Sequence, residues 1–544
     1  MRWHKAPPCA SECSSEGRLK GGCSQDWLPH ILLLLIACSV ASAQTYTIAG
    51  VVKNDSGRPV KRVRVAVANV EARENQTAML TGADGGFRFD ALPAGKYHLT
   101  AEPPAGGRQT YGTRSLSSGF GISVATGPEF HSDHLVFQLV PPAAIGGRVL
   151  DADGEPAEDA LVQLFAVRIL RGRRSVSFSD YAYTDDRGEY RFGGIADGTY
   201  YLAAAGQPWY VGRLRRAIGP LSQMGFATTF YPNVREARSA VALRLKPGQE
   251  LTADFTLMAA PAAKLTVTIN GAPAGTPVQL DLTFEGVAGS KCWERIVEAH
   301  PPQPAEISGI HPGTYTVRAQ AQVGADEVDG SQRVTIGNQN VTATVALSAP
   351  PVMSGKLWLE DVSAIPDGAY IELENETENI HTRRPVAKDG SFQFEAMPPG
   401  HYRPLVGTAR KMIHLRSVTL NGAMAKEEMV EIAADAKLEL LGLVRGGVVS
   451  GTVSRRGEPV AGALVLLAPH QESANPLAYD GFETDSDGSF EFEGLPAGEY
   501  VLIVREEWAD FEYADPAAVR PYLETGRAVR LESGQSQKIR LELK

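Results

Sequence analysis

Cysteine, aromatic residues and long apolar runs are all scarce in this sequence. Five of its 544 residues are cysteine, and 8% are Phe, Trp or Tyr. Four of the cysteines lie before residue 44, which leaves Cys292 alone in the remainder of the chain. A single cysteine can form neither an intrachain disulfide nor a cysteine-based metal cluster. Basic residues are fewer than acidic ones, 53 against 63, which argues against a nucleic-acid-binding surface.

The only long apolar run begins at Ile31 and continues to Ala43, about half the length that a membrane-spanning helix requires. Ala41 and Ala43 form the A-x-A pattern at which export signals are cleaved. We therefore expect a leader and signal peptide over residues 1–43, a mature chain from Gln44, and no transmembrane helix after cleavage. The expected location is secreted, periplasmic or cell-surface. A second interpretation stays open, because residues 35–38 resemble a lipoprotein box in which Cys38 would be acylated.

The short motifs of common catalytic sites are missing as well. None of the 11 histidines has a glutamate three residues later, as a zinc carboxypeptidase site requires. There is no Gly-x-Ser-x-Gly motif, no Walker loop and no dinucleotide fingerprint. The spacing nearest to a metal site, His131 and His134, would place the two side chains on opposite faces of a strand. We therefore expect no enzyme activity, no cofactor and no metal site.

Two acidic turns have a pattern that also occurs in calcium-binding loops. Asp485-Ser486-Asp487-Gly488 and Asp151-Ala152-Asp153-Gly154 carry carboxylates at alternate positions, as calcium loops do. Both stand where the chain needs a turn between strands, and neither is followed by a bidentate glutamate at the EF-hand spacing. Asx turns are therefore the favoured interpretation.

One string of residues recurs along the chain. It reads Asp-Gly-x-Phe-x-Phe and continues to a glycine that stands two residues before a tyrosine. Four copies are clear, in the second of which Arg-Gly and Tyr replace Asp-Gly and the first Phe, and a fifth keeps only its end. The glycine and tyrosine pairs are Gly95 and Tyr97, Gly198 and Tyr200, Gly313 and Tyr315, Gly400 and Tyr402, and Gly498 and Tyr500. The tyrosines lie 87 to 115 residues apart, which is the size of an immunoglobulin-like sandwich.

Each part of the string has a mechanical role. The Asp-Gly step suits a reversal between two strands, because glycine tolerates positive φ. Phe87 and Phe89 share one face of the next strand, since side chains alternate with period two. The glycine then turns the chain into a strand that carries the tyrosine. This placement is like the tyrosine corner of Greek-key sandwiches, where the ring is buried and the hydroxyl bonds to nearby backbone.

A Gly-x-Pro signature precedes three copies of the string. The residues four, six and eight positions after the proline are apolar and should face a core. They are Val63, Val65 and Val67; Ala160, Val162 and Leu164; and Ala463, Val465 and Leu467. One helix is expected near the end, because Asp515 suits an N-cap, Pro516 suits a first turn and Gly526 can end it.

These motifs resemble the carboxypeptidase regulatory-like domain, a transthyretin-like or prealbumin-like sandwich of seven strands grouped with Cna protein B-type domains. The resemblance covers residues 46–101, 145–202 and 448–504 well, and the parts around Tyr402 and Tyr315 less well. It also extends to exported bacterial proteins with several such repeats. In metallocarboxypeptidases this domain is an accessory to the catalytic domain, so the resemblance implies no peptidase activity here.

The predicted fold is all-β, a tandem array of five seven-stranded immunoglobulin-like or prealbumin-like Greek-key sandwiches. We number the predicted sandwiches as repeats one to five, and expect each to be stabilised by its own core. The predicted boundaries are 44–141, 142–260, 261–349 for a degenerate third repeat, 350–445 and 446–544.

Three classes of function are compatible with such an array. The first is a non-catalytic structural or adhesive module at the cell surface or outside the cell. The second is a polysaccharide-binding protein, and the third is an accessory chain of a secreted hydrolase or peptidase. Expected partners are a polysaccharide or a cell-surface protein. Aromatic residues next to charged ones form a candidate ligand platform: Trp508, Phe511, Tyr513, Trp209 and Tyr210. The alternative is that Trp508 and Phe511 cover the end of the core and brace the helix.

Overall fold

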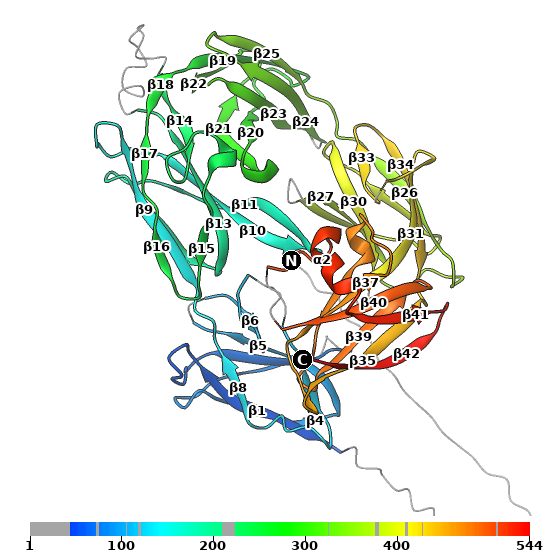
Figure 1. Ribbon diagram of the computed structural model, residues 1–544. Coiled ribbons are helices and arrows are strands. Elements are labelled where there is room, and N and C mark those ends of the chain that lie inside the picture. Colours follow the sequence, from blue (N-terminus) through cyan, green and yellow to red (C-terminus); the bar gives the residue numbers. More distant parts are fainter. Residues whose placement is uncertain are drawn as a thin grey trace, which may run out of the picture. The chain divides into compact units, whose positions relative to one another are not determined.

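A computed structural model of the chain (Figure 1) describes residues 44–71, 76–104, 106–117, 121–208, 224–324, 326–375, 380–408, 412–426, 428–506 and 510–543. Strands dominate, and α2 (Pro516–Leu523) is the one α-helix among these residues. Short 3₁₀ helices are η2 (Ala237–Ser239), η3 (Val287–Gly289) and η4 (Pro476–Ala478). In this part of the chain no helix is both long and apolar enough to cross a bilayer. The predicted all-β sandwich fold is confirmed, and Thr45–Lys544 form one compact unit.

Repeat one shows the strand order that the other repeats follow. One sheet has the order β4-β1-β8, and the other has β3-β2-β5-β6 with β7 also paired to β5. The strands are β1 (Tyr46–Lys53), β2 (Arg64–Asn69), β3 (Gln76–Leu80), β4 (Gly86–Leu92), β5 (Gly95–Glu102), β6 (Gln109–Thr110), β7 (Val124–Thr126) and β8 (Leu135–Gln138). The first strand, β1, pairs antiparallel with β4, the strand of the Phe-x-Phe string, and parallel with the last strand, β8.

Repeat two extends this plan with longer and additional strands. Its sheets are β12-β9-β16 with β17 on β9, and β11-β10-β13-β14-β18 with β15 on β13. The strands are β9 (Ala143–Asp151), β10 (Leu161–Leu170), β11 (Arg173–Tyr183), β12 (Glu189–Ile195), β13 (Gly198–Gly206), β14 (Met224–Phe230), β15 (Leu243–Leu245), β16 (Glu250–Thr252), β17 (Phe255–Leu257) and β18 (Ala259–Pro261). The β10–β11 hairpin is the long element: its strands have 10 and 11 residues, against six and five for β2 and β3.

Repeat three has seven strands in two sheets, β22-β19-β25 and β21-β20-β23-β24. They are β19 (Ala263–Asn270), β20 (Val278–Glu285), β21 (Lys291–Ala299), β22 (Ala305–Ile310), β23 (Gly313–Val323), β24 (Asp326–Ile336) and β25 (Val341–Ala346). The strand order of repeat one is thus preserved where the sequence string is most degenerate.

Repeat four joins its sheets into one, with the order β28-β27-β30-β31-β34-β26-β29, β33 on β30 and β32 on β31. The strands are β26 (Met353–Leu359), β27 (Tyr370–Asn375), β28 (Ile380–Pro385), β29 (Ser391–Phe394), β30 (Gly400–Gly407), β31 (Met412–Leu420), β32 (Ala423–Met424), β33 (Val430–Ile432) and β34 (Ala436–Leu443). The join is β31, which pairs with β30 at Met412 and Ile413 and with β34 from His414 onward, with an irregularity between Leu415 and Ser417.

Repeat five returns to two sheets, β36-β35-β39 with β42 on β35, and β38-β37-β40-β41. The strands are β35 (Gly447–Arg455), β36 (Glu458–Pro459), β37 (Leu464–Pro469), β38 (Asp480–Glu483), β39 (Ser489–Leu495), β40 (Gly498–Arg505), β41 (Arg527–Leu531) and β42 (Ser536–Glu542). The predicted helix is confirmed as α2: the Asp515 carboxylate accepts a hydrogen bond from the Ala517 N–H at 3.0 Å. The amide of Gly526 donates to the Tyr522 carbonyl at 2.9 Å where the helix has ended.

The pairing of first and last strands was not evident from the alternation pattern. It is parallel in all five segments: β1 with β8, β9 with β16 and β17, β19 with β25, β26 with β34, and β35 with β42. Additional short strands take repeats one, two, four and five above the seven strands that we predicted. The boundaries between repeats stay predictions.

A glycine in the middle of the first strand permits this close pairing. A Cβ atom on Gly50 would lie 2.1 Å from the Leu135 carbonyl oxygen of the last strand, and one on Gly451 would lie 1.8 Å from that of Ile539. A Cβ on Gly147 or on Gly355 would likewise collide with a backbone carbonyl oxygen, that of Ala253 or Leu438. The first strand therefore needs glycine at this position in four of the repeats, a signal that our sequence analysis missed.

The residues predicted to face inward do so. Val63, Val65 and Val67 are at most 2% exposed, and the corresponding triplets 160/162/164 and 463/465/467 are at most 1% exposed. In repeat five the intervening Leu464 and Leu466 are buried too. They form a second apolar cluster with Val519 of α2, so this sheet is covered on both faces rather than on one.

A buried threonine connects two strands in repeats one, two and five. Thr484 accepts a hydrogen bond from the Ala463 N–H at 3.0 Å and donates one to the Val460 carbonyl at 2.7 Å. Thr81 and Thr184 make the corresponding bonds. Each stands three residues before the two-residue turn step of the string, so the periodic sequence contained this signal as well.

We predict that Thr484→Val destabilises repeat five, because the isosteric valine leaves a buried N–H and a buried carbonyl without partners. The expected loss of unfolding free energy is about 1–3 kcal/mol. Hydrogen exchange over β37 and β39 measures it within the full chain. Thr484→Ser keeps the hydroxyl and is the matched control. Equal exchange in both variants would show that the hydroxyl contributes nothing.

Candidate functional site

The tyrosine of each string makes the same hydrogen bond in every repeat. Its hydroxyl donates to the carbonyl oxygen of the residue four positions earlier, at 2.8 to 3.0 Å. The pairs are Tyr97 and Pro93, Tyr200 and Ala196, Tyr315 and His311, Tyr402 and Pro398, and Tyr500 and Pro496. All five residues are at most 9% exposed. Burial raises the pKa of Tyr200, Tyr315 and Tyr500, which keeps these hydroxyls protonated as donors.

The glycine two residues before each tyrosine leaves room for the ring. A Cβ on Gly313 would lie 3.1 Å from the Tyr315 ring, and one on Gly498 would lie 3.5 Å from the Tyr500 ring. Gly400 is close to both the Asn375 amide and the Tyr402 ring. Gly95 and Gly198 have positive φ values of 153° and 140°, a conformation that other residues rarely adopt.

The described residues contain only part of the predicted ligand platform. Trp209, Tyr210 and Trp508 lie outside the described residues. The Phe511 ring packs edge-on against Tyr522 of α2, with centroids 5.7 Å apart, and Tyr513 is 9% exposed. Phe511 and Tyr513 both belong to the apolar cluster that contains Val519 of α2, and the ligand platform stays a prediction. Trp358 on β26 is 43% exposed, with the Lys356 ammonium 5.9 Å from its ring. Polysaccharide binding stays a prediction.

The acidic turns have the hydrogen bonds of Asx turns. The Asp151 carboxylate accepts from the N–H groups of Asp153 and Glu155, each at 2.9 Å. Asp487 accepts from the Ser489 N–H at 3.1 Å. His134 is exposed and lies 3.6 Å from its neighbour Asp133. Within the described ranges, no group of three or more His, Cys, Asp or Glu side chains is arranged to hold a metal ion.

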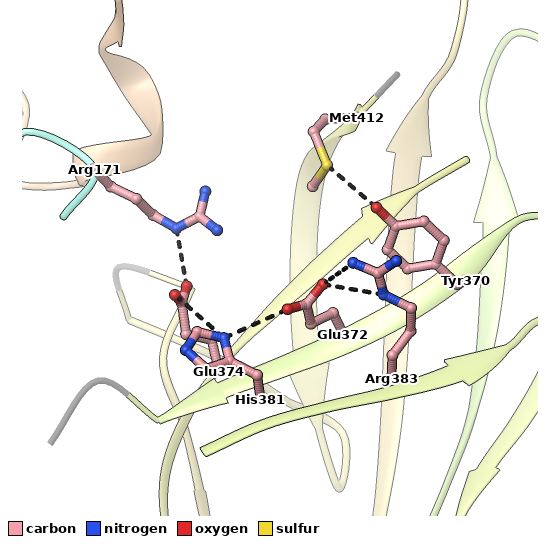
Figure 2. Close-up of polar contacts among 7 residues, drawn as sticks. All are labelled: Arg171, Tyr370, Glu372, Glu374, His381, Arg383 and Met412. Carbon is pink, nitrogen blue, oxygen red and sulfur yellow. Dashed lines mark hydrogen bonds and ion pairs between the residues drawn. The ribbon is translucent and has the colours of Figure 1, made fainter. Parts of the chain in front are cut away.

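A polar cluster lies where the tip of the β10–β11 hairpin meets β27 and β28 (Figure 2). Glu372 and Glu374 are two residues apart and so share one face of β27. His381 and Arg383 stand directly opposite them on β28. From repeat two, Arg171 donates through Nε to Glu374 at 2.9 Å. The cluster thus connects repeat two with repeat four, which are not consecutive in the sequence.

The carboxylates in this cluster are shielded from water and lie next to two guanidinium groups and one imidazole. The side chains of Glu372 and Glu374 are only 17% and 7% exposed. His381 Nδ1 lies 3.4 Å from the first and 3.7 Å from the second. Arg383 bonds to Glu372 at 2.7 Å, which raises the pKa of its guanidinium. The guanidinium groups of Arg171 and Arg383 offset the desolvation cost of burying these carboxylates.

Aromatic and sulfur contacts complete the cluster. The Arg383 guanidinium lies 3.8 Å from the centroid of the Tyr370 ring, a cation–π contact. The Tyr370 hydroxyl points to the Met412 sulfur at 3.8 Å (Figure 2). This is the only hydroxyl among the seven residues drawn, and it bonds to a thioether rather than to a base. The arrangement therefore holds the hairpin of repeat two against repeat four.

The same hairpin reaches repeat five. Its turn residue Gly172 accepts a hydrogen bond from the Ala514 N–H at 2.9 Å, and Arg174 pairs with Glu512 at 3.1 Å. Ile169 packs against the apolar cluster beneath α2. Repeats four and five are joined as well, by Asn475, which donates to Glu428 at 3.0 Å. Burial raises the pKa of that glutamate.

Repeats two and three share an apolar cluster. Phe165 and Phe230 of repeat two pack with Cys292 of repeat three, and all three are at most 1% exposed. The buried Gln163 amide bonds to both the N–H and the carbonyl of Trp293, each at 2.9 Å. Burial raises the pKa of the Cys292 thiol and that of the nearby Glu294 carboxyl. The cores of repeats two and three are therefore in contact at this junction.

The fold and its repeated string define a protein built of tandem β-sandwich repeats. Residues 47–124 and 448–544 match the family model of the carboxypeptidase regulatory-like domain. The resemblance stated from the sequence is thereby confirmed for these two segments, which contain Tyr97 and Tyr500. The comparison with curated proteins gave no match.

Several solved structures are similar over part of the chain. The minor pilin GBS52 of Streptococcus agalactiae is 13% identical, covers 40% of this chain and 97% of its own, and gives a TM-score of 0.23. Two B repeat units of the collagen-binding protein of Staphylococcus aureus are 10% identical, cover 73% and 99%, and give 0.12. The major pilin subunit BcpA of Bacillus cereus is 9% identical, covers 73% and 99%, and gives 0.14. We base the fold on the strand pairing itself.

We predict that Arg171→Met loosens the junction between repeats two and four, because it leaves the buried Glu374 without its closest cation. The expected cost is about 1–3 kcal/mol, reduced from that of a fully buried pair because Arg171 is partly exposed. Arg174→Met is the matched control, since its pair with Glu512 is more exposed and should be worth less than about 1 kcal/mol. Amide exchange at β27 and the hairpin tip measures both. Equal effects would contradict the assignment.

Proposed function

We propose that this chain is a non-catalytic exported repeat protein that acts as a structural or adhesive module at the cell surface or outside the cell. The observation that carries this proposal is the parallel pairing of first and last strands in every repeat. Parallel end strands make a repeat resistant to extension, and a structural module under tension requires this property.

Tension applied to the two ends of a repeat pulls its first and last strands in opposite directions along their axes. The hydrogen bonds between the strands run across this direction, so all of them are loaded together rather than broken one after another. β26 with β34 and β35 with β42 each pair seven residues in this way. A repeat built like this resists extension more than one whose end strands can be peeled apart.

The buried polar groups support the same role. The repeated tyrosines and threonines bond to their own backbone, and the charged cluster of Figure 2 bonds one repeat to another. Their chemistry is used for cohesion, which is what a structural module requires.

Single-molecule extension of the chain by its two ends tests the load-bearing role. In Gly451→Val the added side chain would meet the Ile539 carbonyl and separate β42 from β35. We predict that one high-force unfolding event is lost while the others remain, identified by a released length of about 3.6 Å per residue. Ser450→Val, one position earlier on β35, is the control and should behave as the parent. Identical force records for Gly451→Val and the parent would show that the parallel ladder bears no load.

Export is tested by the mass of the mature protein. If cleavage follows Ala43, the protein recovered from outside the cytoplasm lacks its first 43 residues and has one titratable thiol after denaturation, that of Cys292. A chain that begins at Cys38 with a diacylglyceryl group would instead show lipoprotein processing. An uncleaved cytoplasmic chain would contradict export altogether.

A further inference from the structure

The turn between β38 and β39 of repeat five bonds directly to repeat one. The Asp485 carboxylate accepts from the Ser123 N–H at 2.9 Å and from the Lys96 ammonium at 2.5 Å. The same ammonium donates to the Ser489 hydroxyl at 2.9 Å. Asp485 is 4% exposed and Ser123 is 7% exposed, so water is largely excluded from the contact. The two repeats meet although these residues are more than 350 positions apart.

Backbone groups complete this contact. The Ser486 N–H donates to the Ser123 carbonyl at 3.0 Å, and the Ser486 hydroxyl accepts from the Ala125 N–H at 2.9 Å. Ala125 belongs to β7, a three-residue strand that pairs only with β5 among the described strands. The turn therefore occupies hydrogen-bonding groups that the edge of the repeat-one sheet would otherwise present to water.

Comparison with repeat two shows that Asp485 is used differently from its counterpart. Asp185 stands at the same place in the string, and its carboxylate accepts from the Arg187 and Glu189 N–H groups at 2.9 and 2.8 Å. It stabilises its own turn, and hydrogen bonding to Glu189 lowers its pKa. In repeat five the Asp487 carboxylate accepts the hydrogen bond from the backbone of the turn, at the Ser489 N–H. The Asp485 carboxylate can therefore bind repeat one.

This contact differs in chemistry from the two apolar junctions of repeat two, and it resembles the polar contacts of Arg171 with Glu374 and of Asn475 with Glu428. Apolar clusters join repeat two to repeat three and repeat two to repeat five. No apolar cluster among the described residues contains side chains from both repeat one and repeat five. The contact of repeat one with repeat five is thus polar. It consists of hydrogen bonds, the ion pair of Asp485 with Lys96, whose side chain is 36% exposed, and the Arg114 guanidinium near the Glu483 carboxylate. Such contacts weaken with salt, whereas apolar junctions do not.

We propose that residues 484–489 form a clasp, a releasable contact that holds repeat one against repeat five and opens while both repeats stay folded. Opening separates repeat one from repeat five and leaves it attached to repeat two, where the Leu116 N–H donates to the buried Asp197 carboxylate at 2.7 Å. The clasp goes beyond the load-bearing role proposed above and does not depend on it, because closure and opening are measured without applied force.

The test compares Asp485→Ala with Asp185→Ala in the full chain. Asp485→Ala removes the acceptor of two bonds to repeat one, so the Ser123 and Ala125 amides should exchange at least about tenfold faster, the factor that corresponds to 1.4 kcal/mol. A dye pair on repeats one and five should report separation. Asp185→Ala disturbs a turn of the same type without touching the clasp and should leave both readings unchanged.

Two further measurements distinguish opening from unfolding. Lys96→Met breaks the ion pair from the side of repeat one, leaves the repeat-five turn intact, and should produce the same separation. Raising NaCl from about 0.05 to about 0.5 M should increase Ser123 exchange in the parent and change it little in Asp485→Ala. The proposal is overturned if Ser123 exchange is unchanged in both variants, or if it accelerates only together with the core amides of β5 and β39.

Discussion

The parallel ladder between the last and first strands of each repeat determines most of the remaining packing. The first strand then has a neighbour on each side, the antiparallel string strand and the parallel last strand. A side chain at its centre would collide with a carbonyl of the last strand, which explains Gly50 and Gly451. The Phe ring of the string occupies the space that this glycine leaves, 2.9 Å from the site of the missing Cβ in both repeats.

Local features of the fold followed from the sequence because they depend on short-range geometry. The spacing of Phe87 and Phe89, the tyrosine two residues after a glycine, and the Asp515 cap are set within a few residues of chain. The buried threonines and the strand glycines were equally periodic, but threonine is common in strands of every kind and glycine is simply a weak strand residue. Only the close approach of a distant strand gives them a role, and no local pattern reveals that approach.

The candidate site was less predictable, because it is made by residues from different repeats. Arg171 is one of several arginines near a hairpin turn, and nothing next to it in the sequence indicates Glu374, about 200 positions away. Adjacent aromatic and charged residues likewise fit a ligand platform and a packed support equally well. Phe511 packs against Tyr522 of α2, and the Arg505 guanidinium lies 4.5 Å from the centroid of its ring.

The junctions between repeats differ in chemistry, and therefore in the free energy needed to separate them. Where repeats two and three meet, Phe165, Phe230 and Cys292 exclude water, and separation would expose apolar area at about 25 cal/mol per Å². Where repeats one and five meet, Asp485 and Lys96 exchange protein partners for water, so the net cost of separation is much smaller. A chain with both kinds of junction has a cohesive part and a part that can be released. Because the polar junction involves a turn and a sheet edge, its release leaves the ladders that close each repeat intact.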